Sequence, residues 1–333
     1  RPPRSTPLYS SAASDVYKRQ IELLRESFQV DVWPEDCPPS RDQLVQASQG
    51  CDGLLCMLTD NIDKNFLEAC PQLRVISSMS VGVDHIDIDA LNARKIPLGH
   101  TPGVLVDTTA DLTFALMLAA ARRVPEADNF VRTGTWQEAN RWAPNMFLGK
   151  DVAGSTLGII GLGEIGQAVA RRAAAFNMRI LSWTRSNRSI NGVQNVDMDR
   201  LMSESDFVSL HVELNEQTRG LIDNRAISKM KTGAILVNTA RGGIVDEVAL
   251  AEALSSGQLF AAGLDVFDRE PLQAESLLLT LPNVVFSPHI GSATEGTRTK
   301  MAHIAAENLR LGLGRELMLH CVNRNVEVSI KQV

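Results

Sequence analysis

The sequence contains no apolar run long enough to cross a membrane. The longest candidate, residues 112–121, is interrupted by Thr113 and closed by Arg122 and Arg123. Because a bilayer-spanning helix needs about 20 apolar residues, we expect this stretch to be a buried helix and expect no membrane partner.

Positive charge is also in short supply. The 33 Lys and Arg residues are outnumbered by 39 Asp and Glu residues, which gives a net charge of -6. No run of Lys or Arg is present that would neutralise the phosphates along a duplex. The composition therefore argues against nucleic acid as a partner.

Cysteine is sparse, and no two cysteines form a CxxC pair. An odd number without a secretory signal is a poor basis for disulfides and indicates reduced thiols. We therefore expect a cytoplasmic location, and we expect no metal cofactor. The cysteines are Cys37, Cys51, Cys56, Cys70 and Cys321.

The first twenty residues differ from the rest of the chain. They are rich in Pro, Ser and Arg and show no hydrophobic period, whereas a clear helical pattern begins at Ile21. We interpret residues 1–20 as a leader outside the native fold. The remaining length suggests two domains.

From Ile21 onward, short apolar strands alternate with amphipathic helices. This alternation is typical of βαβ units around a parallel sheet, and it predicts an α/β fold with two units side by side. A Trp-rich segment, 134–149, has no clear period; we expect its Trp136 and Trp142 to pack rather than to line a cleft or a dimer arm. Strands are expected at 30–32, 53–57, 74–78 and 97–100, and then at 156–160, 179–183, 206–210, 234–239, 262–265 and 284–286, with long helices at 108–123 and 297–311.

The second unit carries a GxGxxG motif between a strand and a helix, and in this context the motif indicates a dinucleotide site. Gly161 permits a tight turn, Gly163 lets the backbone approach a pyrophosphate, and Gly166 lets the helix pack closely on the strand. The helix N-terminus offers free N–H groups to the phosphates. The intervening Leu162, Glu164 and Ile165 belong to the same predicted cofactor site.

The next strand bears on which dinucleotide binds. NAD sites usually place Asp or Glu at its end to bind the ribose 2′-hydroxyl, but here the strand is followed by Thr184, Arg185, Ser186 and Arg188. An Arg binds a 2′-phosphate well because its planar fork is bidentate. This pattern favours NADP(H) and leaves NAD(H) possible; the alternative is that both arginines are solvated loop residues.

Hydride transfer to a keto acid needs a cation for the carboxylate and a proton donor with a partner. Arg241 follows an apolar strand and precedes two glycines, which suits the cation. His289 also follows an apolar strand, and histidine titrates near neutrality. A carboxylate beside the imidazole would favour its protonated form, and both Glu270 and Asp268 are candidates.

At this point the sequence resembles the D-isomer-specific 2-hydroxyacid dehydrogenases. Five motifs stand in family order over about residues 21 to 320. They are Val81-Gly-Val-Asp84-His-Ile-Asp87, Gly161-Leu-Gly-Glu-Ile-Gly166, Asn238-Thr-Ala-Arg241-Gly-Gly-Ile-Val-Asp246-Glu, Gly263-Leu-Asp265-Val-Phe-Asp268-Arg-Glu270-Pro271-Leu and Ser287-Pro-His289-Ile-Gly-Ser-Ala-Thr.

The resemblance implies Arg241, Glu270 and His289 as the catalytic set, with Glu270 preferred over Asp268. It implies that Val81 and Gly82 bind the substrate carboxylate through backbone N–H groups, together with Arg241 and His289. The resemblance is also the basis for expecting four further cofactor contacts, at Thr239, Ala240, Asp265 and Gly291.

The family's architecture implies two doubly wound parallel-sheet domains, with a Rossmann nucleotide domain inserted in a flavodoxin-like substrate domain. The expected substrate-binding domain is discontinuous, at 21–102 and 287–333, and the expected NADP-binding domain is 103–286. Family members close around substrate and are usually homodimers.

Within the family the chain is most similar to glyoxylate/hydroxypyruvate reductases, which form glycolate and D-glycerate. The runs 78–85 and 141–149 and the Thr184-Arg185 pair carry this likeness. Two alternatives stay open, another small D-2-hydroxy acid as substrate and a non-catalytic dinucleotide-sensing scaffold.

The sequence departs from the family pattern in three ways. Glu164 and Glu213 replace a common Arg and a common Pro, and Glu164 puts a negative charge near the pyrophosphate unless it points outward. The usual first strand lacks an evident counterpart, which would leave ladder groups of the first sheet unpaired.

Overall fold

The computed structural model describes residues 4–9, 15–35, 37–185 and 190–331. The chain divides into two compact units. Unit 1 contains residues 1–105 and 293–333, and unit 2 contains residues 106–292. The expected boundaries lay a few residues earlier, at 102/103 and 286/287.

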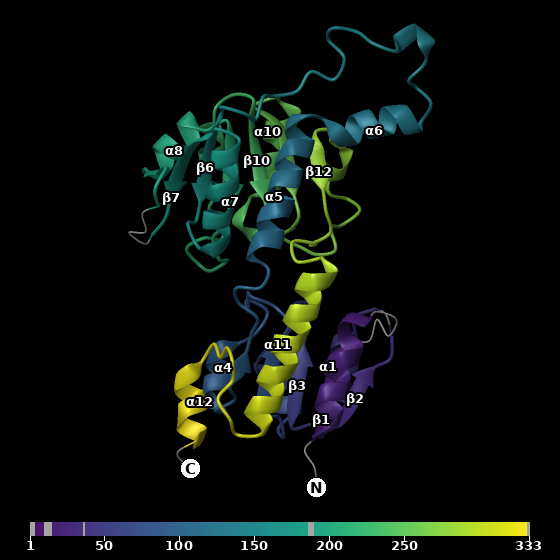
Figure 1. Ribbon diagram of the computed structural model, residues 1–333, viewed down its shortest axis with the longest axis vertical. Helices are drawn as coiled ribbons and strands as arrows, with labels where there is room; N and C mark the ends of the chain where they lie inside the picture. Colours follow the sequence, from purple (N-terminus) through teal and green to yellow (C-terminus); the bar gives the residue numbers. More distant parts are fainter. Residues whose placement is uncertain (1–3, 10–14, 36, 186–189, 332–333) are drawn as a thin grey trace. The chain divides into compact units, whose positions relative to one another are not determined.

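Unit 1 is built on a five-stranded sheet with the order β2-β1-β3-β4-β5, parallel throughout (Figure 1). This is the flavodoxin-like order. The strands are β1 (Arg4–Tyr9), β2 (Gln29–Trp33), β3 (Gly53–Cys56), β4 (Val75–Ser78) and β5 (Leu98–Gly99), and the helices are α1 (Asp15–Arg25), α2 (Arg41–Ser48), α3 (Lys64–Ala69), α4 (Ile88–Ala93), α11 (Glu295–Leu313) and α12 (Arg324–Lys331).

The central strand of unit 1, β3, is buried on both faces because helices cover both. Leu54 of β3 packs with Leu44 of α2 and Phe66 of α3. Its neighbour Leu55 points the other way and packs with Leu309 of α11. Such alternation follows from the two-residue period of a strand, and burial on both sides is typical of parallel sheets.

The N-terminal residues require a correction. We expected residues 1–20 to lie outside the fold, whereas Arg4–Tyr9 form β1 between β2 and β3, and α1 begins at Asp15. In the ladder Ser5 aligns with both Val30 and Gly53. Backbone groups make this pairing, so a segment without a hydrophobic period can still complete the sheet.

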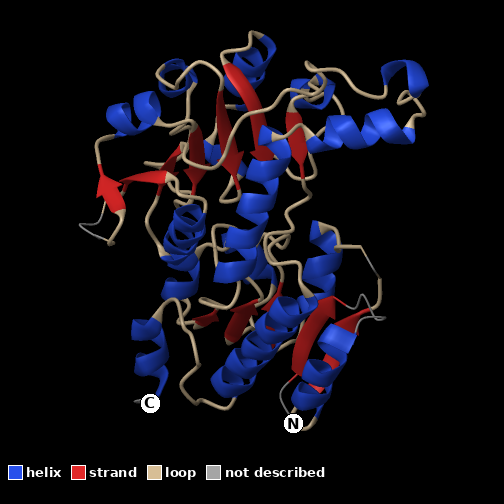
Figure 2. Ribbon diagram, turned by 45° about the horizontal axis from the view of Figure 1, so that its top comes forward, coloured by secondary structure: helices blue, strands red, loops and turns tan. Residues whose placement is uncertain are grey.

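Unit 2 is built on a seven-stranded parallel sheet with the order β12-β11-β10-β9-β6-β7-β8, the Rossmann order extended by one strand (Figure 2). The strands are β6 (Thr156–Ile160), β7 (Arg179–Trp183), β8 (Val193–Asn195), β9 (Phe207–Leu210), β10 (Ala234–Asn238), β11 (Leu259–Leu264) and β12 (Val284–Phe286). The helices are α5 (Val106–Ala121), α6 (Val124–Arg132), α7 (Glu164–Ala175), α8 (Met198–Glu204), α9 (Asn224–Ser228) and α10 (Glu247–Ser255), with short 3-10 turns η1 (Glu138–Asn140), η2 (Gly242–Ile244) and η3 (Leu277–Thr280).

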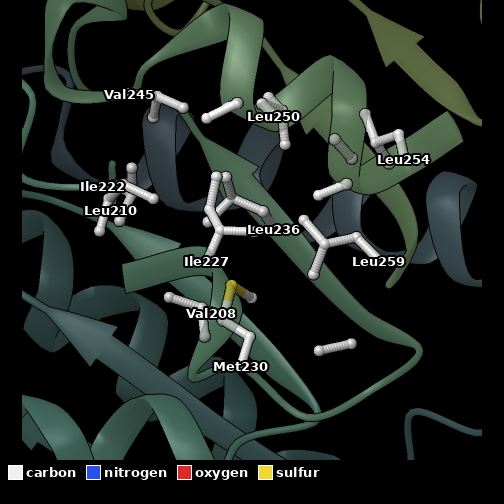
Figure 3. Packing of buried hydrophobic residues seen from close by; sticks show 14 of the residues in the cluster. Val208, Leu210, Ile222, Ile227, Met230, Leu236, Val245, Leu250, Leu254 and Leu259 are labelled. Atoms are coloured by element: carbon white, nitrogen blue, oxygen red, sulfur yellow. The ribbon is translucent and has the colours of Figure 1, made fainter. Parts of the chain in front are cut away.

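The core of unit 2 has two layers, one on each face of the sheet. Leu236 of β10 packs with Val208 of β9 and Leu250 of α10 (Figure 3). Its neighbours on β10, Ile235 and Val237, join the other layer with residues of α5 and α7. The sheet is thereby held rigid between two helical layers.

The segment after α5 differs from the prediction. The helix ends at Ala121, Arg123 takes a left-handed conformation with φ of 55°, and a second helix, α6, begins at Val124. We expected Trp136 and Trp142 to be packed, but their side chains are 53% and 75% exposed. Residues 134–149, all of them described, contain the short turn η1 and no strand, so this segment has no regular apolar face in which to bury the two rings.

Candidate active site

The predicted site residues of unit 2 follow strands that run in the same direction. Gly161 follows β6, Thr239 follows β10, Asp265 follows β11 and Ser287 follows β12. Because these strands are parallel, their carboxyl ends lie at one edge of the sheet. In open α/β sheets this edge binds ligands, at the point where strand order reverses, here beside β6.

The three glycines of the GxGxxG motif meet three different spatial demands. Gly161 has φ of 100°, and a Cβ there would lie 2.5 Å from the carbonyl oxygen of His211. A Cβ on Gly166 would lie 2.1 Å from the carbonyl oxygen of Gly161. A Cβ on Gly163 would meet no atom within 4 Å, so this position is open for a ligand to approach the backbone.

The N-terminus of α7 is free to bind an anion. Its N-cap residue is Gly163, which has no side chain to cap the first N–H groups. These N–H groups and the open space above Gly163 fit the pyrophosphate of a dinucleotide. Glu164 is exposed, and Glu213, the second departure from the family pattern, is exposed as well. Leu162 and Ile165 pack into the core layer that contains α5.

Of the three residues predicted to select NADP, the structure describes only Arg185. It is exposed after β7, and its Nη1 donates to Oε1 of Gln217 at 3.3 Å. Ser186 and Arg188 lie outside the described residues. The described end of β7 therefore presents one cation and no carboxylate.

His289 and Glu270 form a direct pair. The Nδ1 atom of His289 lies 2.7 Å from Oε2 of Glu270. The other oxygen, Oε1, accepts a hydrogen bond from the backbone N–H of Phe267 at 3.0 Å. Burial favours the neutral acid, but the hydrogen bond and charge of His289, the Phe267 N–H and the charge of Arg241 outweigh it, so the pKa of Glu270 is lowered.

Because Glu270 is ionised, it determines which ring nitrogen of His289 carries the hydrogen of their contact. A carboxylate only accepts hydrogen bonds, so Nδ1 must be the donor. The second ring nitrogen, Nε2, is then left to act on another group. This is the arrangement that a general acid or base requires, because its orientation is set by a separate partner.

Asp268, the second candidate for the partner of His289, is turned to a different group. Its Oδ1 lies 3.4 Å from Nη1 of Arg219. Its backbone N–H donates to Oε1 of Glu247 at 2.8 Å. The residues alone left Glu270 and Asp268 open and the family resemblance preferred Glu270; in the structure it is Glu270 that contacts His289.

Arg241 is placed next to this pair by a close contact of two loops. A Cβ on Gly242 would lie 1.7 Å from the carbonyl carbon of Phe267, so only glycine lets the segment carrying Glu270 approach so closely. Asn238 shapes the turn before it, because its Nδ2 donates to the carbonyl oxygen of Arg241 at 2.9 Å. The charge of Arg241 in turn lowers the pKa of Glu270.

Asp265 holds the segment that carries His289. It is 1% exposed, and its carboxylate accepts hydrogen bonds from the N–H groups of Ile290 at 2.8 Å and Gly291 at 2.9 Å. The hydroxyl of Ser287 adds a third, at 2.6 Å. His289 itself has φ of 52°, a conformation that costs a non-glycine residue about 1–2 kcal/mol. These bonds stabilise it in that conformation.

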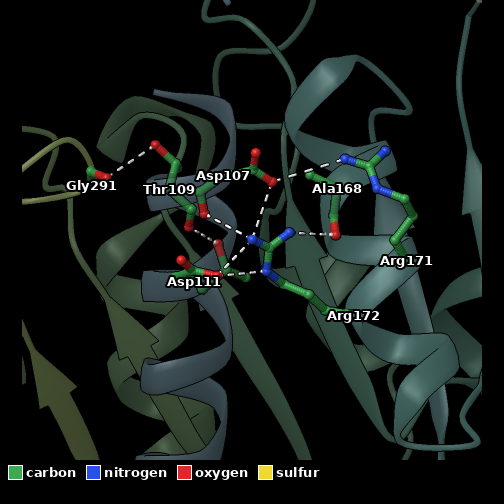
Figure 4. Close-up of polar contacts among 8 residues, drawn as sticks. Asp107, Thr109, Asp111, Ala168, Arg171, Arg172 and Gly291 are labelled. Atoms are coloured by element: carbon green, nitrogen blue, oxygen red, sulfur yellow. Dashed lines mark hydrogen bonds and ion pairs between the residues drawn. The ribbon is translucent and has the colours of Figure 1, made fainter. Parts of the chain in front are cut away.

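Three threonines that sequence reasoning did not single out as a group connect this edge to α5. Thr109 donates from its hydroxyl to the carbonyl oxygen of Gly291 at 3.2 Å (Figure 4). Thr113 donates to the carbonyl oxygen of Thr109 at 2.8 Å, and its Oγ1 lies 2.8 Å from Oγ1 of Thr239. Thr239 and Gly291 are therefore tied to one helix, and Ala240 lies in the turn that Asn238 shapes.

The start of α5 is also bound to α7. The guanidinium of Arg172, on α7, contacts Asp107 at 3.2 Å and Asp111 at 2.6 Å, and Nη1 donates to the carbonyl oxygen of Ala168 (Figure 4). Arg172 is three-quarters buried. Arg171 of α7 also lies 4.0 Å from Asp107, so two arginines bind the first helix of unit 2 to the helix that follows the glycine motif.

Val81 and Gly82 belong to unit 1, in the turn after β4. Among the other histidines of the described residues, His211 directly follows β9, and burial lowers its pKa to about 3. Its Nε2 lies 2.8 Å from Oγ of Ser209, so it is neutral and unsuited to supply a proton near neutral pH.

The described residues contain neither a metal-binding cluster nor a candidate membrane span. No group of three or more His, Cys, Asp or Glu side chains there could hold a metal ion. In the same part of the chain, no helix is both long and apolar enough to cross a bilayer.

Comparison with known proteins identifies the family. Residues 114–291 match the family described as D-isomer specific 2-hydroxyacid dehydrogenase, NAD binding domain. The glyoxylate reductase of Korarchaeum cryptofilum is 46% identical over 316 residues, which cover 94% of this chain and 95% of that protein.

Solved structures agree with this match over nearly the whole chain. The TT0316 protein of Thermus thermophilus has a TM-score of 0.89 and 42% identity, covering 96% of this chain and 99% of that one. The NADPH-dependent glyoxylate/hydroxypyruvate reductase of Sinorhizobium meliloti, in complex with NADP and malonate, has a TM-score of 0.83 and 29% identity, and the match covers 97% of each chain. The chain thus belongs to the D-isomer-specific 2-hydroxyacid dehydrogenase family, and it is an enzyme with an NAD(P)-binding domain of the Rossmann type.

Proposed function

We propose that this enzyme reduces glyoxylate and hydroxypyruvate to glycolate and D-glycerate with NADPH. The observation that carries the proposal is the 2.7 Å pair of His289 and Glu270 at the ligand-binding edge of the sheet that holds the glycine motif. The names of the relatives in Korarchaeum cryptofilum and Sinorhizobium meliloti support the substrate class.

In the proposed reaction, three side chains of unit 2 act on the keto acid. When bound, a reduced nicotinamide supplies the hydride for the carbonyl carbon. His289 donates a proton from Nε2 to the carbonyl oxygen, and Glu270 stabilises the imidazolium from the opposite side of the ring. Arg241 binds the carboxylate through its guanidinium.

The fit of the residues to a dinucleotide rests on the glycine motif and on Asp265. The open position above Gly163 and the uncapped N-terminus of α7 would hold the pyrophosphate. Thr239, Ala240, Asp265 and Gly291, at the carboxyl ends of β10 to β12, would contact the nicotinamide end. In unit 1, the N–H groups of Val81 and Gly82 would bind the substrate carboxylate.

The preference for NADPH over NADH is part of the proposal. Arg185 stands at the end of β7, where NAD sites place an acid. A guanidinium there attracts a 2′-phosphate, and Ser186 and Arg188, which lie outside the described residues, are proposed to assist it. The Sinorhizobium meliloti structure contains NADP.

We further propose a homodimer in the cytoplasm. An arm formed by α6 and residues 133–148 extends from the sheet of unit 2 (Figure 1), and several of its apolar side chains are at least half exposed. Exposed apolar side chains that gather on one segment are typical of a protein interface, and a second copy of the chain would cover them. None of the five cysteines, all of which lie within the described residues, forms a disulfide, which suits a reducing compartment. The exposed apolar residues are Val124, Val131, Trp136, Trp142 and Leu148.

Steady-state oxidation of NADPH and NADH with glyoxylate, hydroxypyruvate and pyruvate tests the activity. We expect NADPH-dependent turnover of hydroxypyruvate that the His289→Ala variant loses by at least about a hundredfold, with the exposed His303→Ala as control. A folded protein that binds NADPH but turns over none of these acids would refute the proposal and favour the scaffold alternative. Turnover confined to pyruvate would instead favour a different D-2-hydroxy acid.

Sedimentation velocity tests the dimer. We expect the wild type to sediment as a dimer, and the double variant Val131→Ser, Trp142→Ser as a monomer at the same concentration. A wild-type monomer at micromolar concentration would contradict this part of the proposal.

A further inference from the structure

We propose that His100 and Ser80 are positioning residues that orient a row of three backbone N–H groups, those of Val81, Gly82 and Val83, toward the substrate carboxylate. The identity of the anion rests on the proposed function. The orientation of the row rests on hydrogen bonds within unit 1 alone.

Three consecutive carbonyl groups of this turn are each bound by a donor. The carbonyl oxygen of Ser80 accepts from the backbone N–H of Thr101 at 2.9 Å. That of Val81 lies 3.2 Å from Nδ1 of His100. That of Gly82 accepts from the hydroxyl of Ser80 at 2.7 Å.

The planarity of the peptide bond converts these contacts into directions for the next N–H groups. In a trans peptide, the C=O of one residue and the N–H of the next point in opposite directions. The N–H groups of Val81, Gly82 and Val83 therefore point away from Thr101, His100 and the Ser80 hydroxyl. Within the described residues, no group accepts a hydrogen bond from any of the three. Adjacent unpaired N–H groups form an anion-binding feature.

The contact of His100 with the carbonyl oxygen of Val81 determines the tautomer of the imidazole ring. A carbonyl oxygen only accepts, so Nδ1 of His100 carries a hydrogen. Burial lowers the pKa of His100, so the ring is neutral at neutral pH and Nε2 is unprotonated. The backbone of His100 is itself held, because Nδ2 of the fully buried Asn308 donates to its carbonyl oxygen at 2.9 Å.

The Ser80 hydroxyl is directed by a chain of donors. Ser80 has one hydroxyl hydrogen, which goes to Gly82, so the 2.7 Å contact between Ser78 and Ser80 must use the hydrogen of Ser78. The 3.2 Å contact between Ser78 and Nε2 of His85 must then be donated by His85. His85 is thus assigned a hydrogen on Nε2, whereas His100 is assigned one on Nδ1.

Nitrogen-15 NMR of the wild-type enzyme tests the assignment without any substrate. At pH 8 we expect the Nδ1–H tautomer for His100 and an Nε2-bound hydrogen for His85, with signals identified by His100→Asn and His85→Gln variants. An Nε2–H tautomer for His100 would overturn the proposal, whatever the activity of the enzyme.

Kinetics test the consequence for substrate binding. His100→Leu removes the donor, whereas His100→Asn keeps an N–H near the Nδ1 position. We expect His100→Leu and Ser80→Ala to raise KM for glyoxylate about two- to tenfold, the range of one neutral hydrogen bond, and His100→Asn to restore it. The affinity for NADPH should stay unchanged, since both residues lie in unit 1, and His303→Asn on the exposed face of α11 serves as the control.

An unchanged KM in a folded His100→Leu variant would overturn the positioning role. If the wild type turns over neither glyoxylate nor hydroxypyruvate, the proposed function fails, and the NMR measurement still decides how the row is held. The two failures are therefore distinguishable.

Discussion

The hydroxyl of Thr109 donates a hydrogen bond to the carbonyl oxygen of Gly291, two residues after His289. Thr109 lies in the first helix of unit 2 and is 4% exposed. The N–H group of Gly291 donates a hydrogen bond to the carboxylate of Asp265 at 2.9 Å. The peptide groups after His289 are therefore held between a strand end and α5, and this restrains the segment that carries the His289 imidazole.

Replacing Thr109 with Val keeps the shape of the side chain and removes the hydroxyl. The buried carbonyl of Gly291 then lacks its donor, so we expect the free energy of unfolding to fall by about 1–3 kcal/mol. We also expect kcat to fall about three- to tenfold, because the His289 segment loses one of its restraints. Thermal unfolding and steady-state kinetics measure the two effects. Thr109→Ser keeps a hydroxyl and is the matched control; equal behaviour of Val and Ser variants would contradict the role of this hydrogen bond.

Replacing Glu270 with Gln should slow the reaction. The amide carries no charge to stabilise a protonated ring at His289, and it can turn an N–H group toward Nδ1 in place of an acceptor. We expect kcat to fall about a hundredfold or more, as measured by steady-state kinetics. Asp268→Asn is the control, since Asp268 faces Arg219. A loss of kcat in the Asp268 variant and none in the Glu270 variant would reverse the assignment.

Glu270 should also make stability depend on pH in the acid range. Burial raises the pKa of Glu270, but the combined effect of His289, Phe267 and Arg241 lowers it by more. The pKa in the folded protein therefore lies below the ordinary value of 4.5. The unfolded chain then binds the proton more tightly, and the stabilising contribution is complete above about pH 5 and is lost as pH falls through the folded pKa. Urea unfolding of wild type and Glu270→Gln between pH 7 and pH 3 measures it. The difference between the two should shrink with acidification; a difference that grows would have the wrong sign.

Replacing Arg185 with Ala should weaken NADPH binding selectively. A charge-assisted hydrogen bond to the 2′-phosphate contributes about 1.5–3 kcal/mol, so we expect KM for NADPH to rise roughly ten- to a hundredfold. KM for NADH should change little. Arg225→Ala, at an exposed position on α9, is the control for lost surface charge. An equal rise of KM for both cofactors would show that Arg185 does not bind the 2′-phosphate.

The glycine motif allows a contrast between stability and binding. Gly166→Ala places a Cβ 2.1 Å from a backbone oxygen, so we expect a lower melting temperature and weak cofactor binding together. Gly163→Ala meets no protein atom within 4 Å, so we expect a melting temperature close to wild type and a loss of NADPH affinity. Fluorescence titration with NADPH and thermal unfolding give the two readouts. Normal NADPH affinity in Gly163→Ala would mean that the pyrophosphate lies elsewhere.

The structure contains several helices and one strand that the sequence pattern did not predict. The helices α6, α8, α9, α10 and α12 and the strand β8 were not predicted, because they are short or lack a clean apolar period. Asp197 and Asp223 are N-caps of α8 and α9, with side chains that accept from Arg200 and Ala226. These capping residues were the available signals for two of the missed helices.

The sequence by itself determined the α/β class, the dinucleotide motif and the family, because each depends on local rules. Hydrophobic period decides strand or helix, and a turn such as that at Gly161 requires glycine wherever it occurs. Five motifs in family order also brought Arg241 and His289 to attention, since each follows a predicted strand.

Only the tertiary structure decided which groups meet. In the structure His289 contacts Glu270 rather than Asp268. Thr109 donates a hydrogen bond to Gly291, 182 positions later in the sequence. Residues 4–9 form a strand of the first sheet. Such contacts join segments that are distant along the chain, and their geometry is set by the packing of strands and helices against one another. A sequence read in order carries the identity of these residues but not the distances between them.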